Sequence, residues 1–227
     1  MAKPVLLSLA LSLLACSNAL LGPREKAPDF SATAVVGTKF ETVSLKQYLD
    51  AGQWTVLFFY PFDFTFVCPT EIMAFSSKAK EFASKGVQIL GVSCDSHHVH
   101  LAWTRTAREE GGLGNEVEFP LVADISKEIS KAYGVLTTDQ TVGYFGAPLR
   151  AVFIIDPTGI IRSVTVNDEQ VGRSIDEVMR VVDGFQYAES HAGEGCPANW
   201  QPGAKTIKAD ADASKDFFRE WAKTAGK

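Results

Sequence analysis

Blocks of apolar residues alternate along the chain with polar segments, and their spacing predicts strands and helices. The run Trp54–Tyr60, made of β-branched and aromatic residues, is typical of a strand buried on both faces. Other apolar runs predict strands at 87–94, 119–123, 151–156 and 160–166. Apolar residues at helical spacing predict helices at 69–85, from 95 past Trp103, at 126–133 and at 174–189.

This alternation indicates an α/β fold, in which helices cover both faces of a central sheet. The strands on either side of the turn Pro157-Thr158-Gly159 are expected to pair antiparallel, so the sheet should be mixed. From residue 190, glycine, proline, asparagine and lysine dominate until an amphipathic stretch at 214–223. We therefore predict one domain at 27–189 and an extended tail at 190–227 that crosses the surface and ends in a helix.

The N-terminus has the pattern of a targeting leader. A basic start at Lys3 precedes an apolar run at 5–15, and Ser17-Asn18-Ala19 supplies the small residues that a signal peptidase reads. We predict a secretory signal peptide at 1–19, and hence the endoplasmic reticulum lumen or secretion. Lipoprotein processing at Cys16 and a plastid-directed leader are the alternatives. The run is too short to span a bilayer, and no later stretch predicts a membrane span.

Charge and cysteine content exclude several classes of protein. A formal net charge of −5 over 227 residues argues against a nucleic-acid surface. The cysteines are too scattered for a disulfide scaffold or for paired C-x2-C metal ligands. They are Cys16, Cys68, Cys94 and Cys196. Cys94 ends a predicted strand and is expected to fill the core, and no metal is expected at Cys94 and the nearby His97, His98 and His100.

Cys68 has the sequence setting of a reactive cysteine. It follows a loop that carries Asp63 and Thr65, and Pro69 after it suits the first turn of a helix. Unpaired N–H groups and the positive end of the helix dipole favour a thiolate there, which is the nucleophilic form of cysteine. A buried apolar filler is the alternative. Glu71 stands where a thioredoxin-type C-x-x-C motif would have its second cysteine.

One family shares this arrangement of residues. The segment Pro61–Cys68, PFDFTFVC, matches the P-x-x-x-T-x-x-C signature of the peroxiredoxins, and DFTFVCPTE resembles that of their typical two-cysteine subfamily. Further similar segments are GVSCDSHHVHLAW at 91–103, FPLVAD at 119–124, VNDEQVGRS at 166–174 and GEGCPANW at 193–200. The resemblance runs from about Ala27 to the C-terminal helix. It implies a thioredoxin-like fold and a thiol peroxidase that reduces hydrogen peroxide and organic hydroperoxides without a cofactor.

The resemblance also implies which residues carry the peroxide chemistry. Cys68 would be the peroxidatic cysteine, which becomes a sulfenic acid. Thr65 would accept the thiol proton or orient the peroxide, and Pro61 would shield the pocket from water. From the residues alone, Thr65 has a helix cap or solvent exposure as its alternative.

Three charged residues would support that cysteine. Arg150 would hold the thiolate and polarise the peroxide, and Glu71 and Arg173 would orient Arg150. Without the resemblance, the residues alone favour simpler alternatives. These are a surface residue at a strand edge for Arg150, a helix cap or solvent exposure for Glu71, and an ordinary salt bridge for Arg173.

The second cysteine of the reaction would be Cys196. By resemblance, Cys196 of a second subunit attacks the Cys68 sulfenic acid, and thioredoxin or a thioredoxin-like protein reduces the resulting intersubunit disulfide. This requires a head-to-tail homodimer, which family members often assemble into a decamer. A free tail thiol is the alternative for Cys196. For the whole chain, the alternatives are a disulfide oxidoreductase or isomerase, and a ring-forming chaperone or peroxide-signalling role.

The chain departs from the family pattern in two places. Gly111-Gly112-Leu113-Gly114 matches a loop that, with a Tyr-Phe pair on the C-terminal helix, marks members prone to over-oxidation. Here the pair reads Phe217-Phe218. The segment 139–148, DQTVGYFGAP, is several residues longer than the family's loop before Arg150, and its sequence indicates no role.

Overall fold

The computed structural model describes residues 19–223, so the expected leader lies outside these residues except for Ala19. The strands of the main sheet are β1 Ser31–Val36, β2 Lys39–Ser44, β3 Trp54–Phe59, β4 Val87–Ser93, β5 Leu121–Ala123, β6 Arg150–Ile155 and β7 Ile161–Asn167. The helices are α1 Leu45–Asp50, α2 Cys68–Ser84, α3 His97–Arg105, α4 Glu128–Ala132, α5 Ile175–Ser190 and α6 Ser214–Trp221, with a 3-10 turn at Arg108–Glu110. The tail also carries two short strands, β8 Glu194–Gly195 and β9 Ile207–Lys208.

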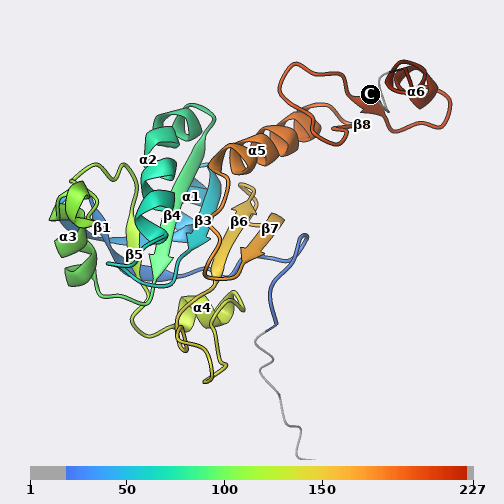
Figure 1. Cartoon of the computed structure of the whole chain (residues 1–227). Helices are drawn as coiled ribbons and strands as arrows, with labels where there is room; N and C mark the ends of the chain where they lie inside the picture. The colour runs from blue at the N-terminus through green and yellow to red at the C-terminus, as the bar shows by residue number, and fades with distance from the viewer. Residues whose placement is uncertain (1–18, 224–227) are drawn as a thin grey trace, which may run out of the picture.

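The seven main strands form one mixed sheet in the order β2-β1-β5-β4-β3-β6-β7 (Figure 1). Strand β4 pairs in parallel with β3 and β5, and the other pairs are antiparallel. The expected α/β fold with a mixed sheet is therefore confirmed, as is the antiparallel pair β6 and β7. Ser96 and Ser174 cap α3 and α5 through their side chains, close to the helix starts that the sequence indicated.

Strand β3 lies at the centre of the fold because both of its faces are apolar. Val56 and Phe58 join a core formed with α2, α3 and α5, whereas Leu57 and Phe59 join a second core formed with α1 and α4. Alternate side chains thus pack against different layers, which explains why the sequence of β3 is a continuous apolar run.

The sequence patterns missed the N-terminal hairpin β1–β2 and helix α1. Most of β2 is exposed, so its residues give no apolar run from which a strand could be predicted. A capping box between Ser44 and Gln47 starts α1. The prediction for Cys94 was wrong. Strand β4 ends at Ser93, and Cys94 is only half-buried beside the hydroxyl of Ser130.

The expectation that the tail crosses the surface of the domain was also wrong. The tail extends away from the body beyond the end of α5 (Figure 1). Its first part folds back onto α5, where the carbonyl oxygen of Trp200 accepts a hydrogen bond of 3.2 Å from Arg180 and the Trp200 ring is buried beside Tyr187. The tail is therefore anchored by α5 rather than by the sheet.

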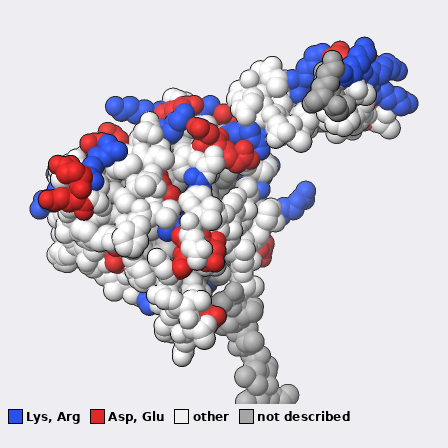
Figure 2. Space-filling view, in the orientation of Figure 1, with Lys and Arg blue, Asp and Glu red and all other residues white. Residues whose placement is uncertain are grey.

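Basic side chains gather at the outer end of the tail in Figure 2. Several of them are paired with acidic residues: Lys205 with Glu220, Lys215 with Asp212, and Arg219 with Asp216. Such exposed pairs contribute little to stability. Within residues 19–223, no helix combines the length and the apolar character needed to cross a membrane.

Close packing around Phe58 gives a test of this core. Phe58 stacks on Phe75 at a ring-centroid distance of 4.4 Å, and a Cβ atom at Gly91 would lie 2.8 Å from its Cζ atom. We expect Gly91→Ala to lower the free energy of unfolding by about 1–3 kcal/mol, since the buried ring must move. Urea denaturation measures this. Gly143→Ala is the control, because nothing lies within 4 Å of its Cβ position, and equal midpoints for both variants would contradict the packing.

Candidate active site

Cys68 is the first residue of α2 and is fully buried. Val67 precedes it as the N-cap and offers no side-chain cap, and Pro69 follows it without an N–H group. No capping side chain therefore competes with the sulfur for the positive end of this long helix. The predicted helix start at this cysteine is confirmed.

The side chain of Arg150 contacts the sulfur of Cys68. Its Nη1 atom donates to Sγ at 3.2 Å and to Oε2 of Glu71 at 2.7 Å. Both charged side chains are almost completely buried. Burial alone would lower the pKa of Arg150, but the contacts with Cys68 and Glu71 raise it, so the guanidinium stays charged beside the sulfur.

Arg173 completes this cluster and ties it to the sheet. Its Nε and Nη2 atoms donate to the two carboxylate oxygens of Glu71 at 2.7 and 2.8 Å. Its Nη1 atom donates to the carbonyl oxygens of Phe59, at the end of β3, and Ala151, near the start of β6. Burial opposes the charge of Glu71, but the hydrogen bonds from Arg173 lower its pKa below the ordinary value.

The segment 61–67 leads into Cys68 and carries the other two expected residues. The Thr65 hydroxyl donates to the carbonyl oxygen of Phe62 at 2.8 Å, so its oxygen can still accept a hydrogen bond from the thiol or the peroxide. Pro61 is buried. Thr65 is only three positions before Cys68 in the sequence. Among the described contacts, however, the two side chains form no hydrogen bond with each other.

Sequence reasoning missed a buried polar network that fixes this segment. His100 Nδ1 lies 2.7 Å from one carboxylate oxygen of Asp63, and the Tyr60 hydroxyl donates to the other at 2.9 Å. The backbone N–H of Asp63 donates to Asp95 at 2.9 Å. Buried polar groups need such partners. A histidine inside the apolar stripe of a predicted helix was the available signal.

Comparison with known proteins identifies the family. The model of the AhpC/TSA family matches residues 23–164, and that of the C-terminal domain of 1-Cys peroxiredoxin matches 184–220. The chain belongs to the AhpC/TSA family. Peroxiredoxin-2 of Cricetulus griseus is 53% identical over 205 residues, which cover 90% of this chain and 98% of that protein. The chloroplastic 2-cysteine peroxiredoxin of Chattonella marina var. antiqua is 53% identical over 194 residues, covering 86% and 95%.

A solved structure agrees with this assignment. The crystal structure of reduced 2-Cys peroxiredoxin from Plasmodium vivax is similar with a TM-score of 0.81 and 39% identity, and the match covers 88% of this chain and 99% of that one. The thioredoxin-like peroxiredoxin fold is confirmed, and the chain is a thiol peroxidase.

Cys196 lies outside the cluster that surrounds Cys68. The Cys196 thiol donates to the carbonyl oxygen of Gly184 on α5 at 3.6 Å, and it lines a small cavity with Arg180. Burial raises the pKa of the Cys196 thiol, while Arg180 opposes the rise. Both Cys68 and Cys196 are free thiols. The structure thus joins Cys68, Arg150, Glu71 and Arg173 in one cluster and leaves Cys196 outside it.

The loop and helix expected to mark over-oxidation are also separate within this subunit. A groove beside the first turns of α2 is lined by Pro69, Gly111 and Gly112. Helix α6 packs on β9 instead, and the rings of Phe217 and Phe218 contact each other. Within this subunit, the rings of Phe217 and Phe218 therefore do not line the groove that contains Gly111 and Gly112.

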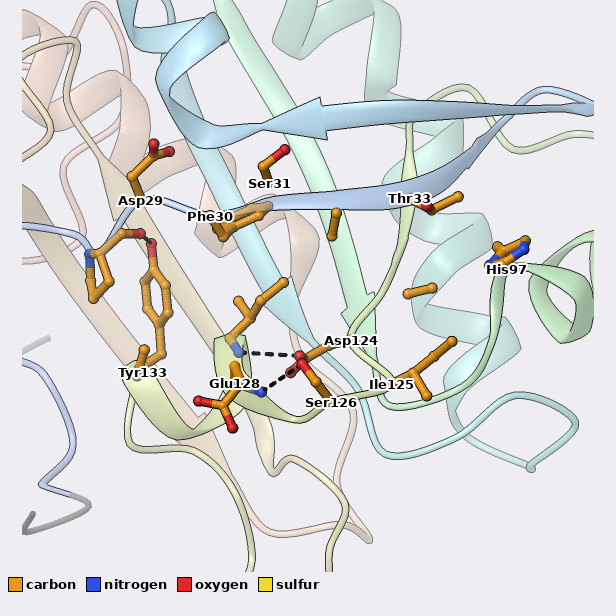
Figure 3. A pocket seen from close by; sticks show the side chains of 15 residues that line it. Asp29, Phe30, Ser31, Thr33, His97, Asp124, Ile125, Ser126, Glu128 and Tyr133 are labelled. Atoms are coloured by element: carbon orange, nitrogen blue, oxygen red, sulfur yellow. Dashed lines mark hydrogen bonds between the residues drawn. The ribbon is translucent and has the colours of Figure 1, made fainter.

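A cavity of about 620 Å³ lies between the start of β1 and α4, and none of its lining residues belongs to the Cys68 cluster (Figure 3). Two of its polar side chains have structural partners, whereas the buried Nδ1 atom of His97 has no hydrogen-bond partner among the described residues. Asp124 accepts hydrogen bonds from the N–H groups of Ile129 and Ser130 at the start of α4, and the Tyr133 hydroxyl donates to the carbonyl oxygen of Pro28. No group of three metal-ligating side chains occurs in the part of the chain that the structure describes.

Glu71 holds two buried cations, so its removal should be costly. We expect Glu71→Gln to lower the free energy of unfolding at pH 7 by about 3–5 kcal/mol. A carboxylate with a lowered pKa stabilises the fold above its ordinary pKa of 4.5, and this contribution is lost as the pH falls through the lowered value. Urea denaturation at pH 7 and at pH 3 should therefore show a smaller difference between the two proteins at pH 3.

Glu81→Gln is the matched control for this experiment. Glu81 lies on the same helix but forms an exposed pair with Lys78, so we expect a change within about 0.5 kcal/mol. An equal loss in both variants at pH 7 would show that the buried position of Glu71 has no special weight.

Proposed function

We propose that Cys68 is the sulfur that reacts with peroxide in this thiol peroxidase, and that Arg150, Glu71 and Arg173 prepare it. The observation that supports this most is the contact of 3.2 Å between Arg150 Nη1 and Cys68 Sγ in a fully buried site. The two guanidinium groups and the one carboxylate leave one positive charge without a counter-charge. A thiolate at Cys68 supplies the missing negative charge. This favours the thiolate, because a buried charge without a partner is costly.

The proposed reaction begins when this thiolate attacks one oxygen of the peroxide. The O–O bond breaks, the sulfur becomes a sulfenic acid, and the other oxygen leaves as water or an alcohol after taking up a proton. Arg150 stabilises the negative charge that moves onto the leaving oxygen. The Thr65 oxygen accepts a hydrogen bond from the thiol or the peroxide, and buried Pro61 limits water. Both electrons come from sulfur, so the step needs no cofactor.

We further propose that Cys196 of a second subunit resolves the sulfenic acid. Within one subunit, Cys196 contacts α5 and Cys68 contacts Arg150, which favours a partner on another chain. The names of the relatives from Chattonella marina and Plasmodium vivax refer to two cysteines. The resulting intersubunit disulfide would be reduced by thioredoxin or a thioredoxin-like protein, and the head-to-tail homodimers would assemble into a decamer.

The division of the chain follows from these roles. Residues 27–189 would be the peroxidase domain and 190–227 the tail that presents Cys196. Residues 1–19 would be a leader. Their pattern favours the secretory pathway, and the chloroplastic name of the Chattonella marina relative favours a plastid.

Replacing each cysteine by serine tests the proposed roles. In stopped-flow assays of hydrogen peroxide consumption, Cys68→Ser should be inactive. Cys196→Ser should consume one equivalent of peroxide and then stop, because thioredoxin cannot regenerate it. Peroxide reduction by Cys68→Ser would refute the proposal.

Non-reducing gels test the intersubunit bridge in the same proteins. After one equivalent of peroxide, the wild type should run at twice the subunit mass, and neither serine variant should. If the oxidised wild type runs only as a monomer, then Cys196 does not act on a second chain.

Processing of the leader can be tested directly. We expect the mature protein to begin at Leu20, because Ala19 is the predicted cleavage position. N-terminal sequencing of protein purified from its native compartment measures this. A mature chain that retains Met1, or one that begins at a lipidated Cys16, would contradict the prediction.

A further inference from the structure

The segment 139–148 forms an excursion whose two limbs are joined at the base. The N–H of Thr137 donates to the carbonyl oxygen of Ala147 at 2.8 Å, and the N–H of Gly146 donates back to Thr137 at 2.9 Å. The return limb is buried from Gly146 to Pro148 and leads directly into Arg150 at the start of β6. The position of the excursion is therefore coupled to the arginine that contacts Cys68.

One side chain of this excursion turns back to the body. The ring of Tyr144 stacks on that of Phe62, with centroids 6.2 Å apart and an angle of 23° between the planes. Val142 and Phe145, on either side of it, are exposed. Aromatic pairs at such separations attract each other beyond the area that they bury. Tyr144 therefore fastens the excursion to the segment 61–67.

Phe62 links Tyr144 to the residues around Cys68. Its carbonyl oxygen accepts the hydrogen bond from the Thr65 hydroxyl, and its neighbours Pro61 and Asp63 are buried. The network of Asp63 and His100 holds the segment from inside the molecule. Tyr144 holds it from the outer side, through a half-buried ring.

The segment 61–67 must open during turnover. Cys68 has no exposed surface, whereas a disulfide brings two sulfur atoms to about 2 Å. A thiol from another chain can reach Cys68 only when the segment that precedes it moves away and uncovers the sulfur.

We propose that Tyr144 is a positioning residue that keeps the segment 61–67 closed over Cys68 and so sets how long the sulfenic acid stays enclosed. This rests on the proposed role of Cys68. Two reactions compete for the sulfenic acid. Condensation with the Cys196 thiol forms the disulfide and releases water, and oxidation by a second peroxide forms the sulfinic acid and releases water or an alcohol. The open segment favours the first reaction and the closed segment the second.

Three variants of the full chain test this inference. Tyr144→Ala removes the stacked ring, Tyr144→Phe keeps it, and Phe145→Ala removes an exposed ring of the same excursion that stacks on no described residue. In Tyr144→Ala we expect disulfide formation to accelerate about two- to ten-fold, the range that one aromatic pair supplies. The sulfinic fraction of Cys68, measured by mass spectrometry over a series of hydrogen peroxide concentrations, should fall accordingly. Tyr144→Phe and Phe145→Ala should match the wild type.

Hydrogen exchange of the reduced proteins supplies a measurement that does not depend on peroxide chemistry. Amides of the segment 62–68 should exchange faster in Tyr144→Ala than in the other three proteins. Unchanged exchange and an unchanged ratio of disulfide to sulfinic acid would overturn the inference, and so would equal effects in Phe145→Ala. If wild-type Cys68 is not modified by peroxide at all, the proposed function fails instead, and the exchange rates still decide whether Tyr144 closes the segment.

Discussion

Two buried arginines share the carboxylate of Glu71, and the geometry of the reactive centre depends on this contact. Since neither guanidinium can turn to water, both are held in the orientation that the carboxylate sets. Arg173 uses its remaining donors on the carbonyl oxygens of β3 and β6, which fixes the cluster to the sheet. Nitrogen Nη1 of Arg150 directs one N–H group to Glu71 and the other to Cys68. The position of the Cys68 sulfur is thus set by Arg150, whose own position is set by the ion pairs that connect α2 to the sheet.

The fold brings these side chains together from distant parts of the sequence. Strands β3 and β6 are antiparallel neighbours, so the C-terminal end of β3 and the N-terminal end of β6 lie at the same end of the sheet. Helix α2 begins shortly after β3, and Arg173 follows β7 just before α5. A helix N-terminus and two arginines therefore meet at one end of the sheet. This is why the reactive cysteine follows a strand buried on both faces, since such a strand cannot shift its register.

Periodicity alone predicted the elements that have a strong apolar pattern, such as β3 and α2, because their residues face the two cores. The hairpin β1–β2 escaped, since most of β2 is exposed and its pattern is weak. The contacts of Glu71 with Arg150 and Arg173 could not be derived from spacing, because they join residues about 80 and 100 positions apart, and only family resemblance suggested them. The direction of the tail depends on contacts between Arg180 and Trp200 that no local pattern encodes.

The site has to meet two opposing requirements. A buried Cys68 keeps its contact with Arg150, but the same burial prevents any second thiol from reaching it. The strong contacts, those of Glu71, fix α2 to the sheet and would be costly to break in every turnover. Opening should therefore take place in the segment between β3 and α2, which takes no part in the ion pairs of Glu71. A stacked pair such as Phe62 and Tyr144 has the small energy that such a movable segment needs, because a region that opens often must lie at the low end of local stability.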